Sequence, residues 1–150
     1  MRPLAFAYGS NLDAAQMKRR CPTAVLLEPA LLRSVRLVFC GRSTRWGGGG
    51  VASLVRDPTS VVYGAIYRLE PHDLARLDAF EGAPIVYERI RVSLCDVYGR
   101  RRRAQAYVLA RRSRPRAPSP DYLLTILRAY GALGFDAAPV LRAAFAEVFR

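Results

Sequence analysis

The sequence predicts a single α+β domain, spanning residues 1–150, with about six or seven strands whose sheet can close into a barrel. Three observations support this class. The chain has the length of one ordinary domain, and 51% of its residues are hydrophobic, enough for a sizeable core. Strand-like segments dominate the first two thirds, whereas two helical segments end the chain. Loops are short, and neither a repeat nor a linker divides the sequence.

The first predicted elements are a strand, a turn and a helix. Leu4–Tyr8 is apolar and aromatic, which is typical of a short buried strand, and Gly9–Asn11 breaks it. Asp13–Cys21 has a helical pattern with Ser10 or Asn11 available as the N-cap, and Pro22 ends it.

The next region predicts four strands. The segments are Ala24–Leu32, Val35–Gly41, Val51–Arg56 and Val61–Leu69. Asp57–Ser60 has the composition of a turn and separates the last two.

A second helix and a hairpin follow. Pro71–Phe80 has helical spacing of its leucines, with proline suited to the first turn. Tyr87–Leu94 and Arg102–Ala110 flank Asp96–Gly99, a good hairpin connection.

The chain ends with a loop and two amphipathic helices. Arg111–Pro120 is rich in proline and arginine. Gly134 then separates the predicted helices Tyr122–Leu133 and Ala137–Phe149.

Composition limits the classes of function. Three scattered cysteines (Cys21, Cys40 and Cys95) and one histidine (His72) argue against a disulfide framework and a metal cluster. We therefore expect neither metal nor cofactor, with Cys40 and Cys95 packed in the interior. No apolar run approaches the ~20 residues that span a bilayer, and no signal peptide is recognisable, so we expect a cytoplasmic protein without membrane contact.

The net charge of +12 suggests an anionic partner such as nucleic acid. Almost all the positive charge is arginine spread along the chain, which makes nucleic acid an unlikely partner. The run Arg100–Arg103 fits a solvated hairpin edge better than a phosphate-binding patch.

Three segments have the residue types of a site. Phe6–Leu12 is a strand that runs into a glycine turn, where backbone N–H groups can bind a carboxylate or an oxyanion. Glu81 stands at a helix end between Phe80 and Gly82, where apolar surroundings would raise its pKa into the range of a proton shuttle. Trp46–Gly50 fits a flexible loop or one that closes over a substrate. Taken singly, the first pattern is more typical of a plain capped strand–turn–helix connection, and the second of an ordinary solvated glutamate in a last helical turn.

Taken together and in order, these motifs resemble the γ-glutamyl cyclotransferase (AIG2-like) family. The segments that carry the resemblance are Phe6–Leu12 (FAYGSNL), Gly48–Leu54 (GGGVASL), Val62–Tyr67 (VYGAIY), Leu77–Gly82 (LDAFEG), Tyr87–Arg89 (YER) and Ala117–Tyr122 (APSPDY).

The resemblance implies a small mixed β-barrel with surrounding helices and a specific reaction. In that reaction, the α-amine of a small-molecule γ-glutamyl substrate attacks its own side-chain carbonyl and releases 5-oxoproline and an amine or amino acid. It implies that Glu81 is catalytic. The residues that it implies for substrate binding are Ala5, Phe6, Ala7, Tyr8, Gly9, Ser10, Asn11, Leu12, Tyr87, Tyr107 and Tyr122.

The residue after Tyr8-Gly9-Ser10 is Asn11. In this position the sequence resembles the branch of the family with broad γ-glutamyl-amine and γ-glutamyl-amino-acid substrates rather than the glutathione-specific members. The chemistry needs neither a metal nor a covalent nucleophile, because ring closure is intramolecular and one carboxylate can move the protons. Two alternatives remain, a non-catalytic small-molecule-binding relative and a basic nucleic-acid-binding protein. We expect a monomer or a homodimer.

Overall fold

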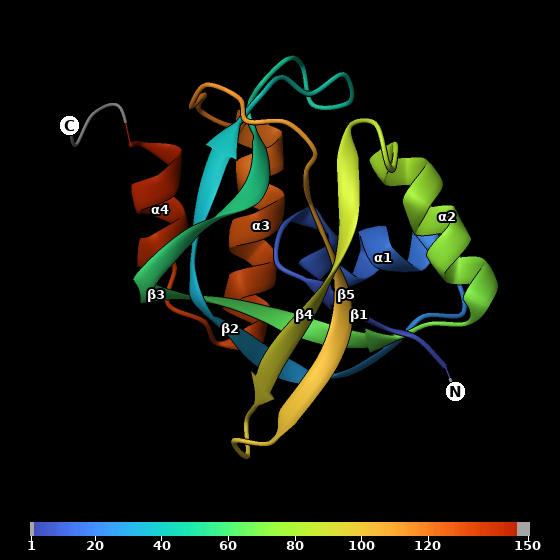
Figure 1. The fold of residues 1–150 in the computed structure, drawn as a ribbon. Coiled ribbons are helices and arrows are strands. Elements are labelled where there is room, and N and C mark those ends of the chain that lie inside the picture. The colour runs from blue at the N-terminus through green and yellow to red at the C-terminus, as the bar shows by residue number, and fades with distance from the viewer. Residues whose placement is uncertain (1, 147–150) are drawn as a thin grey trace.

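The computed structural model describes residues 2–146 and consists of a five-stranded barrel with helices around it (Figure 1). The strands are β1 (Leu4–Ala7), β2 (Val25–Cys40), β3 (Val51–Arg68), β4 (Tyr87–Asp96) and β5 (Arg101–Leu109). The helices are the 3₁₀ helix η1 (Ser10–Leu12) and the α-helices α1 (Ala14–Arg20), α2 (Pro71–Glu81), α3 (Pro120–Leu133) and α4 (Ala138–Ala144).

The barrel closes in the order β1-β3-β2-β4-β5, with β5 returning to β1. The pairing of β1 with β3 is antiparallel and that of β1 with β5 is parallel, so the sheet is mixed. The predicted α+β class and the mixed barrel are thus confirmed. Because β1 has a strand on either side, its residues Ala5, Phe6 and Ala7 are buried.

The predicted number of strands, six or seven, is wrong. Ala24–Leu32 and Val35–Gly41 belong to one strand, β2, which bends at Ser34, where φ is +65°. Val51–Arg56 and Val61–Leu69 belong to one strand, β3, because both parts pair with β2.

The predicted turn at Asp57–Ser60 is instead a bulge inside β3. The ladder passes from the Val35–Arg56 pair to the Arg33–Val61 pair, which leaves these four residues without a partner in β2. The Asp57 carboxylate accepts hydrogen bonds from the Thr59 amide (3.1 Å) and the Ser60 hydroxyl (2.8 Å). Local turn chemistry is therefore present, but the chain does not reverse there.

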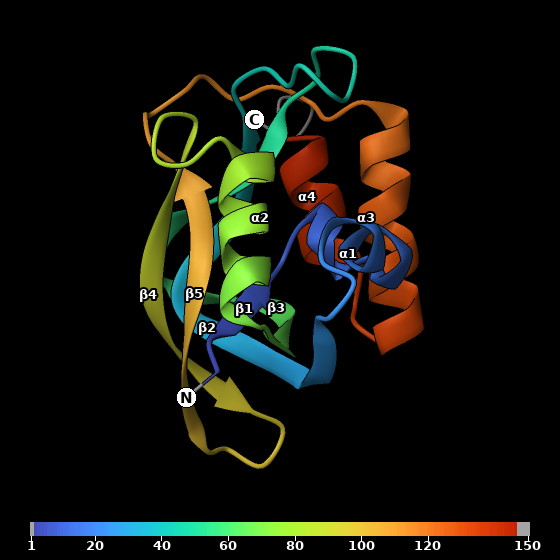
Figure 2. The ribbon, with the colours of Figure 1, turned by 90° about the vertical axis from the view of Figure 1, so that its right-hand side faces the viewer.

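The helices lie on opposite sides of the barrel. In Figure 1, α3 and α4 cover one side and α2 lies on the other. Figure 2 shows α2 in front, with β4 and β5 to one side and α1 and α3 to the other. The loops 41–50, 82–86 and 110–119 gather at one end, opposite the β4–β5 turn (Figure 1).

Helix boundaries agree with expectation apart from two details. Asp13 caps α1, accepting a hydrogen bond from the Gln16 amide, in place of the expected Ser10 or Asn11. The predicted last helix, 137–149, has α4 only over 138–144, and residues 147–149 lie outside the described part of the chain. Among residues 2–146 no helix has the length and hydropathy needed to cross a bilayer.

One glycine lets β1 and β3 approach each other closely. A Cβ built on Gly64 would lie 2.5 Å from Cε1 of Phe6 and would collide with the Ala7 carbonyl oxygen. Only glycine fits this position without moving β1. Gly64 therefore helps to place the end of β1 and the loop that follows it.

Candidate active site

A cavity of about 490 Å³ opens at the end of the barrel where the three loops gather. Its lining contains ten of the twelve residues that the sequence implied for the site. They are Phe6, Ala7, Tyr8, Gly9, Ser10, Asn11, Glu81, Tyr87, Tyr107 and Tyr122. The other two, Ala5 and Leu12, are buried in the core and do not line the cavity.

The turn after β1 forms one wall. The Leu12 amide donates to the Gly9 carbonyl oxygen (3.0 Å), which closes η1. The amides of Gly9, Ser10 and Asn11 come before Leu12 in the chain, at the start of this helix. The first N–H groups of a helix have no hydrogen-bond partner within the helix. A Cβ on Gly9 would lie 3.2 Å from the Cβ of Ala52 and 3.6 Å from the Tyr122 hydroxyl, so a side chain there would enter the cavity lining.

Glu81 is the last residue of α2 and points into the cavity. Gly82 ends the helix in the left-handed conformation, with φ of +65°, and its amide donates to the Ala79 carbonyl oxygen. Glu81 is the single carboxylate in the cavity lining formed by the described residues. Only 15% of its side chain is exposed to solvent.

Two polar side chains, Asn11 and Arg20, contact Glu81, and Gln16 in turn holds Asn11. Asn11 Nδ2 donates to Glu81 Oε1 at 3.0 Å, while Asn11 Oδ1 accepts from Gln16 Nε2 (3.1 Å) and Arg20 Nη1 (3.1 Å). Because a guanidinium can only donate, the Asn11 oxygen must face Arg20 and the amide nitrogen must face Glu81. Arg20 Nη1 also lies 3.7 Å from Glu81 Oε1.

These surroundings act on the Glu81 carboxyl in opposite directions. Burial raises its pKa above the ordinary value, whereas Arg20, the hydrogen bond from Asn11 and Arg45 lower it in part. Burial prevails, so the pKa is raised. A carboxyl group with a raised pKa can both accept and return a proton near neutral pH.

Four tyrosines surround the cavity, and protein groups hold each hydroxyl. Tyr8 donates to the Tyr107 carbonyl oxygen and Tyr87 to the Ala52 carbonyl oxygen (3.0 Å). Tyr122 accepts from the Ala52 amide (3.0 Å). Burial raises the pKa of Tyr8, Tyr87, Tyr107 and Tyr122, so all four phenols are neutral at pH 7.

Asp78, one turn before Glu81, faces a different set of partners. Its carboxylate accepts from the Tyr107 hydroxyl (2.6 Å) and from Arg89 Nη1 (2.9 Å). It does not line the cavity. We interpret Asp78 as a structural residue whose hydrogen bonds link α2 to the β4–β5 hairpin.

The glycine-rich segment is packed against the proline-rich loop. A Cβ on Gly50 would collide with the Arg116 carbonyl oxygen, and a Cβ on Gly49 would collide with the Ser119 amide. Trp46 packs on Tyr122, with ring centroids 5.1 Å apart, and lines the cavity. At these two glycines, close backbone packing explains the residue type. Closure of the loop over a substrate remains a prediction.

Sequence reasoning missed Gln16, Arg20 and Arg45. Gln16 and Arg20 are four residues apart, so they share a face of α1, which was a usable signal. Arg45 comes from the irregular loop between β2 and β3, and no hydrophobic periodicity in the sequence predicts where that loop lies relative to the cavity. The guanidinium carbons of Arg20 and Arg45 lie 5.1 and 5.0 Å from the centroid of the Phe80 ring.

The expectation that the protein needs neither a metal nor a cofactor stays a prediction. Within residues 2–146, no three His, Cys, Asp or Glu side chains come together as a metal site. Cys21 and Cys40 are buried and Cys95 is half-buried, all as free thiols.

Comparison with known proteins identifies the family. The family model described as "Gamma-glutamyl cyclotransferase, AIG2-like" matches residues 5–124. The chain belongs to this family. The γ-glutamylcyclotransferases of mouse and human are 33% and 31% identical to it over 125 and 124 residues, which are 79% of this chain. The chain spans 65% of the length of these relatives.

Solved structures have the same fold. One described as a γ-glutamyl cyclotransferase superposes with a TM-score of 0.85 at 26% identity, covering 92% of this chain and 83% of that one. A mouse AIG2-like protein superposes with a TM-score of 0.61 at 20% identity, covering 81% of this chain and 82% of that one, and supports the fold alone.

Proposed function

We propose that this chain is a γ-glutamyl cyclotransferase that converts a γ-glutamyl amine or amino acid into 5-oxoproline and the free amine. The observation that carries the proposal is the position of Glu81. It is the single carboxylate in the cavity lining of the described residues, and it is held by Asn11 beside the turn after β1. Family membership and the γ-glutamylcyclotransferase names of its relatives support the same activity.

The reaction begins with the substrate's α-ammonium, whose free pKa of about 8 leaves it mostly protonated at pH 7. Glu81 takes one proton, and the amine attacks the side-chain amide carbon to form the ring C–N bond. Because nucleophile and carbonyl belong to one molecule, holding the substrate folded supplies much of the rate. The amides of Gly9, Ser10 and Asn11 are available to stabilise the oxyanion.

Breakdown of the tetrahedral intermediate restores the enzyme. Protonated Glu81 gives its proton to the amide nitrogen, and the exocyclic C–N bond breaks. The lactam nitrogen then loses a second proton, which Glu81 passes to the departing amine. Two protons thus move from the attacking to the leaving nitrogen, and neither water nor a net proton is consumed.

The test is direct. The protein is incubated with a panel of γ-glutamyl amino acids and γ-glutamyl amines, and 5-oxoproline and the released amine are measured by mass spectrometry. We expect both products in equal amounts. α-Glutamyl-alanine is the matched control, because its alanine is not attached to the side-chain carbonyl and must not be released. Binding of panel members without any 5-oxoproline would favour the non-catalytic alternative.

A further inference from the structure

The lining of the cavity carries far more positive than negative charge. Four arginines line the cavity, namely Arg20, Arg42, Arg45 and Arg111, against the single carboxylate of Glu81. Arg20 lies at Glu81 and Asn11, so its charge is already matched. The other three are exposed, and within residues 2–146 none of them lies within salt-bridge distance of a carboxylate.

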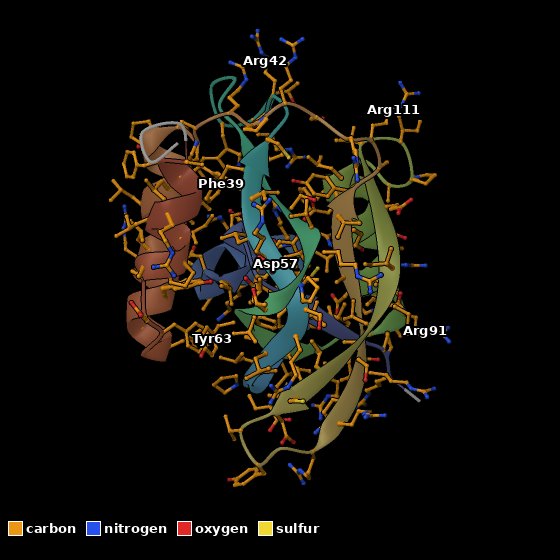
Figure 3. The ribbon with its side chains drawn as sticks, turned by 60° about the vertical axis from the view of Figure 1, so that its left-hand side comes forward. Phe39, Arg42, Asp57, Tyr63, Arg91 and Arg111 are labelled. Carbon is orange, nitrogen blue, oxygen red and sulfur yellow. The ribbon has the colours of Figure 1, made fainter. Side chains whose placement is uncertain are left out.

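These three arginines approach the cavity from two loops. Arg42 and Arg45 come from the segment between β2 and β3, and Arg111 follows β5. Figure 3 shows Arg42 and Arg111 at the same end of the molecule, with Arg91 lower on the hairpin. The Arg45 guanidinium lies over the ring of Phe80, the residue that directly precedes Glu81 in the chain. This contact holds the positive charge of Arg45 near the end of the cavity that contains Glu81.

We propose that Arg42, Arg45 and Arg111, called the arginine rim below, bind acid groups of the leaving amine and make acidic amino acids the preferred leaving groups. This inference rests on the proposed function and names the substrate class. A γ-glutamyl-aspartate or γ-glutamyl-glutamate dipeptide brings two carboxylates on its leaving part. A polyamine or a lysine side chain would bring a second amine, which is protonated at neutral pH.

The electrostatic reason is the balance of charge at the rim. Like charges brought together in a cleft repel, so an extra ammonium among three unmatched guanidiniums is disfavoured. A carboxylate gains from each guanidinium and can be bound by two parallel hydrogen bonds. The apolar rim residues Ile85 and Val86, which are 81% and 54% exposed, offer contact area but no means of distinguishing charge.

The experiment compares four substrates that differ chiefly in charge. They are γ-glutamyl-aspartate, its near-isostere γ-glutamyl-asparagine, γ-glutamyl-asparagine amide and γ-glutamyl-putrescine. We expect kcat/KM to fall in that order, with aspartate preferred over asparagine by about 2- to 5-fold, the range for one exposed ion pair. Raising the salt to 1 M should reduce this ratio toward one.

The decisive variant replaces the rim by R42Q/R45Q/R111Q. It should lower kcat/KM for γ-glutamyl-aspartate by about 10-fold or more, mainly through KM, and abolish the preference for aspartate over asparagine. The control R91Q/R101Q/R103Q removes the same charge from exposed positions of the β4–β5 hairpin that do not line the cavity. It should keep the preference. A ratio measured within one variant is unaffected by partial misfolding.

Two outcomes are distinguishable. If 5-oxoproline forms but aspartate and asparagine substrates react equally well, or if the rim variant keeps the wild-type preference, the inference is wrong and the proposed function stands. If no substrate of the series or of the larger panel yields 5-oxoproline, the proposed function itself fails.

Discussion

Asn11 and Glu81 are 70 residues apart in the chain, yet Nδ2 of Asn11 donates a hydrogen bond to Oε1 of Glu81 at 3.0 Å. This contact joins the turn after β1 to the end of α2 within the lining of the cavity. It links the backbone amides that can hold the substrate's oxygen to the carboxyl group proposed to move its protons. The proposed active site therefore combines two segments that are distant in the sequence.

The first prediction concerns that hydrogen bond. Asn11→Ala should lower kcat/KM by about 10- to 100-fold, because a hydrogen bond to a charged group contributes about 1.5–3 kcal/mol. Steady-state kinetics measures the loss, and circular dichroism checks the fold. Kinetics within twofold of wild type would show that Glu81 does not need this partner.

The second prediction concerns the pH dependence. Burial raises the pKa of Glu81, and Arg20 lowers it in part. Removing the Arg20 charge must therefore raise that pKa further, so the acid limb of the kcat/KM profile of Arg20→Gln should move to higher pH. Arg20→Lys keeps the charge and should restore most of the limb's position.

Arg19→Gln is the matched control for this profile. Arg19 is the exposed neighbour of Arg20 on α1, and it does not line the cavity. Its replacement removes the same charge and should leave the acid limb in place. An unmoved limb in Arg20→Gln would mean that Arg20 does not act on the titrating group.

The third prediction concerns the close approach of β1 and β3. Gly64→Ala should lower the free energy of unfolding by about 3 kcal/mol or more, because the new Cβ would press against the Phe6 ring. Gly131→Ala is the control, since a Cβ at this exposed position of α3 meets nothing within 4 Å. That change should stabilise the helix by about 0.5–1 kcal/mol. Urea unfolding measures both, and equal effects would contradict the packing argument.

Local sequence signals predicted the elements that local chemistry determines. The strand–turn–helix start, the helix ending at Glu81 and the β4–β5 hairpin have caps, glycines and prolines at the required offsets. The strand count could not be predicted in this way. Asp57–Ser60 has real turn chemistry, and only the pairing of β3 with β2 on both sides reveals one strand.

Sequence motifs predicted many of the residues that line the candidate site, but they did not predict the residues that tertiary folding brings to it from elsewhere in the chain. Glu81 and Asn11 lie in motifs that resemble the family, but nothing local indicates that they touch. Arg45 reaches Phe80 only because the loop between β2 and β3 folds over the end of α2. The arginine rim is therefore a product of tertiary structure, and the even spread of arginine along the sequence concealed it.

The measurement that tests the central claim most directly is product formation by Glu81→Gln. Glutamine keeps the size and hydrogen-bonding shape of the side chain but cannot carry a proton. Because proton-transfer catalysis is worth about 10²–10⁴-fold, kcat should fall by that factor while the Kd for 5-oxoproline changes little. Glu88→Gln, at an exposed position of β4 outside the cavity, is the control and should keep wild-type kcat. A Glu81→Gln variant that retains more than about a tenth of the wild-type kcat would contradict the account.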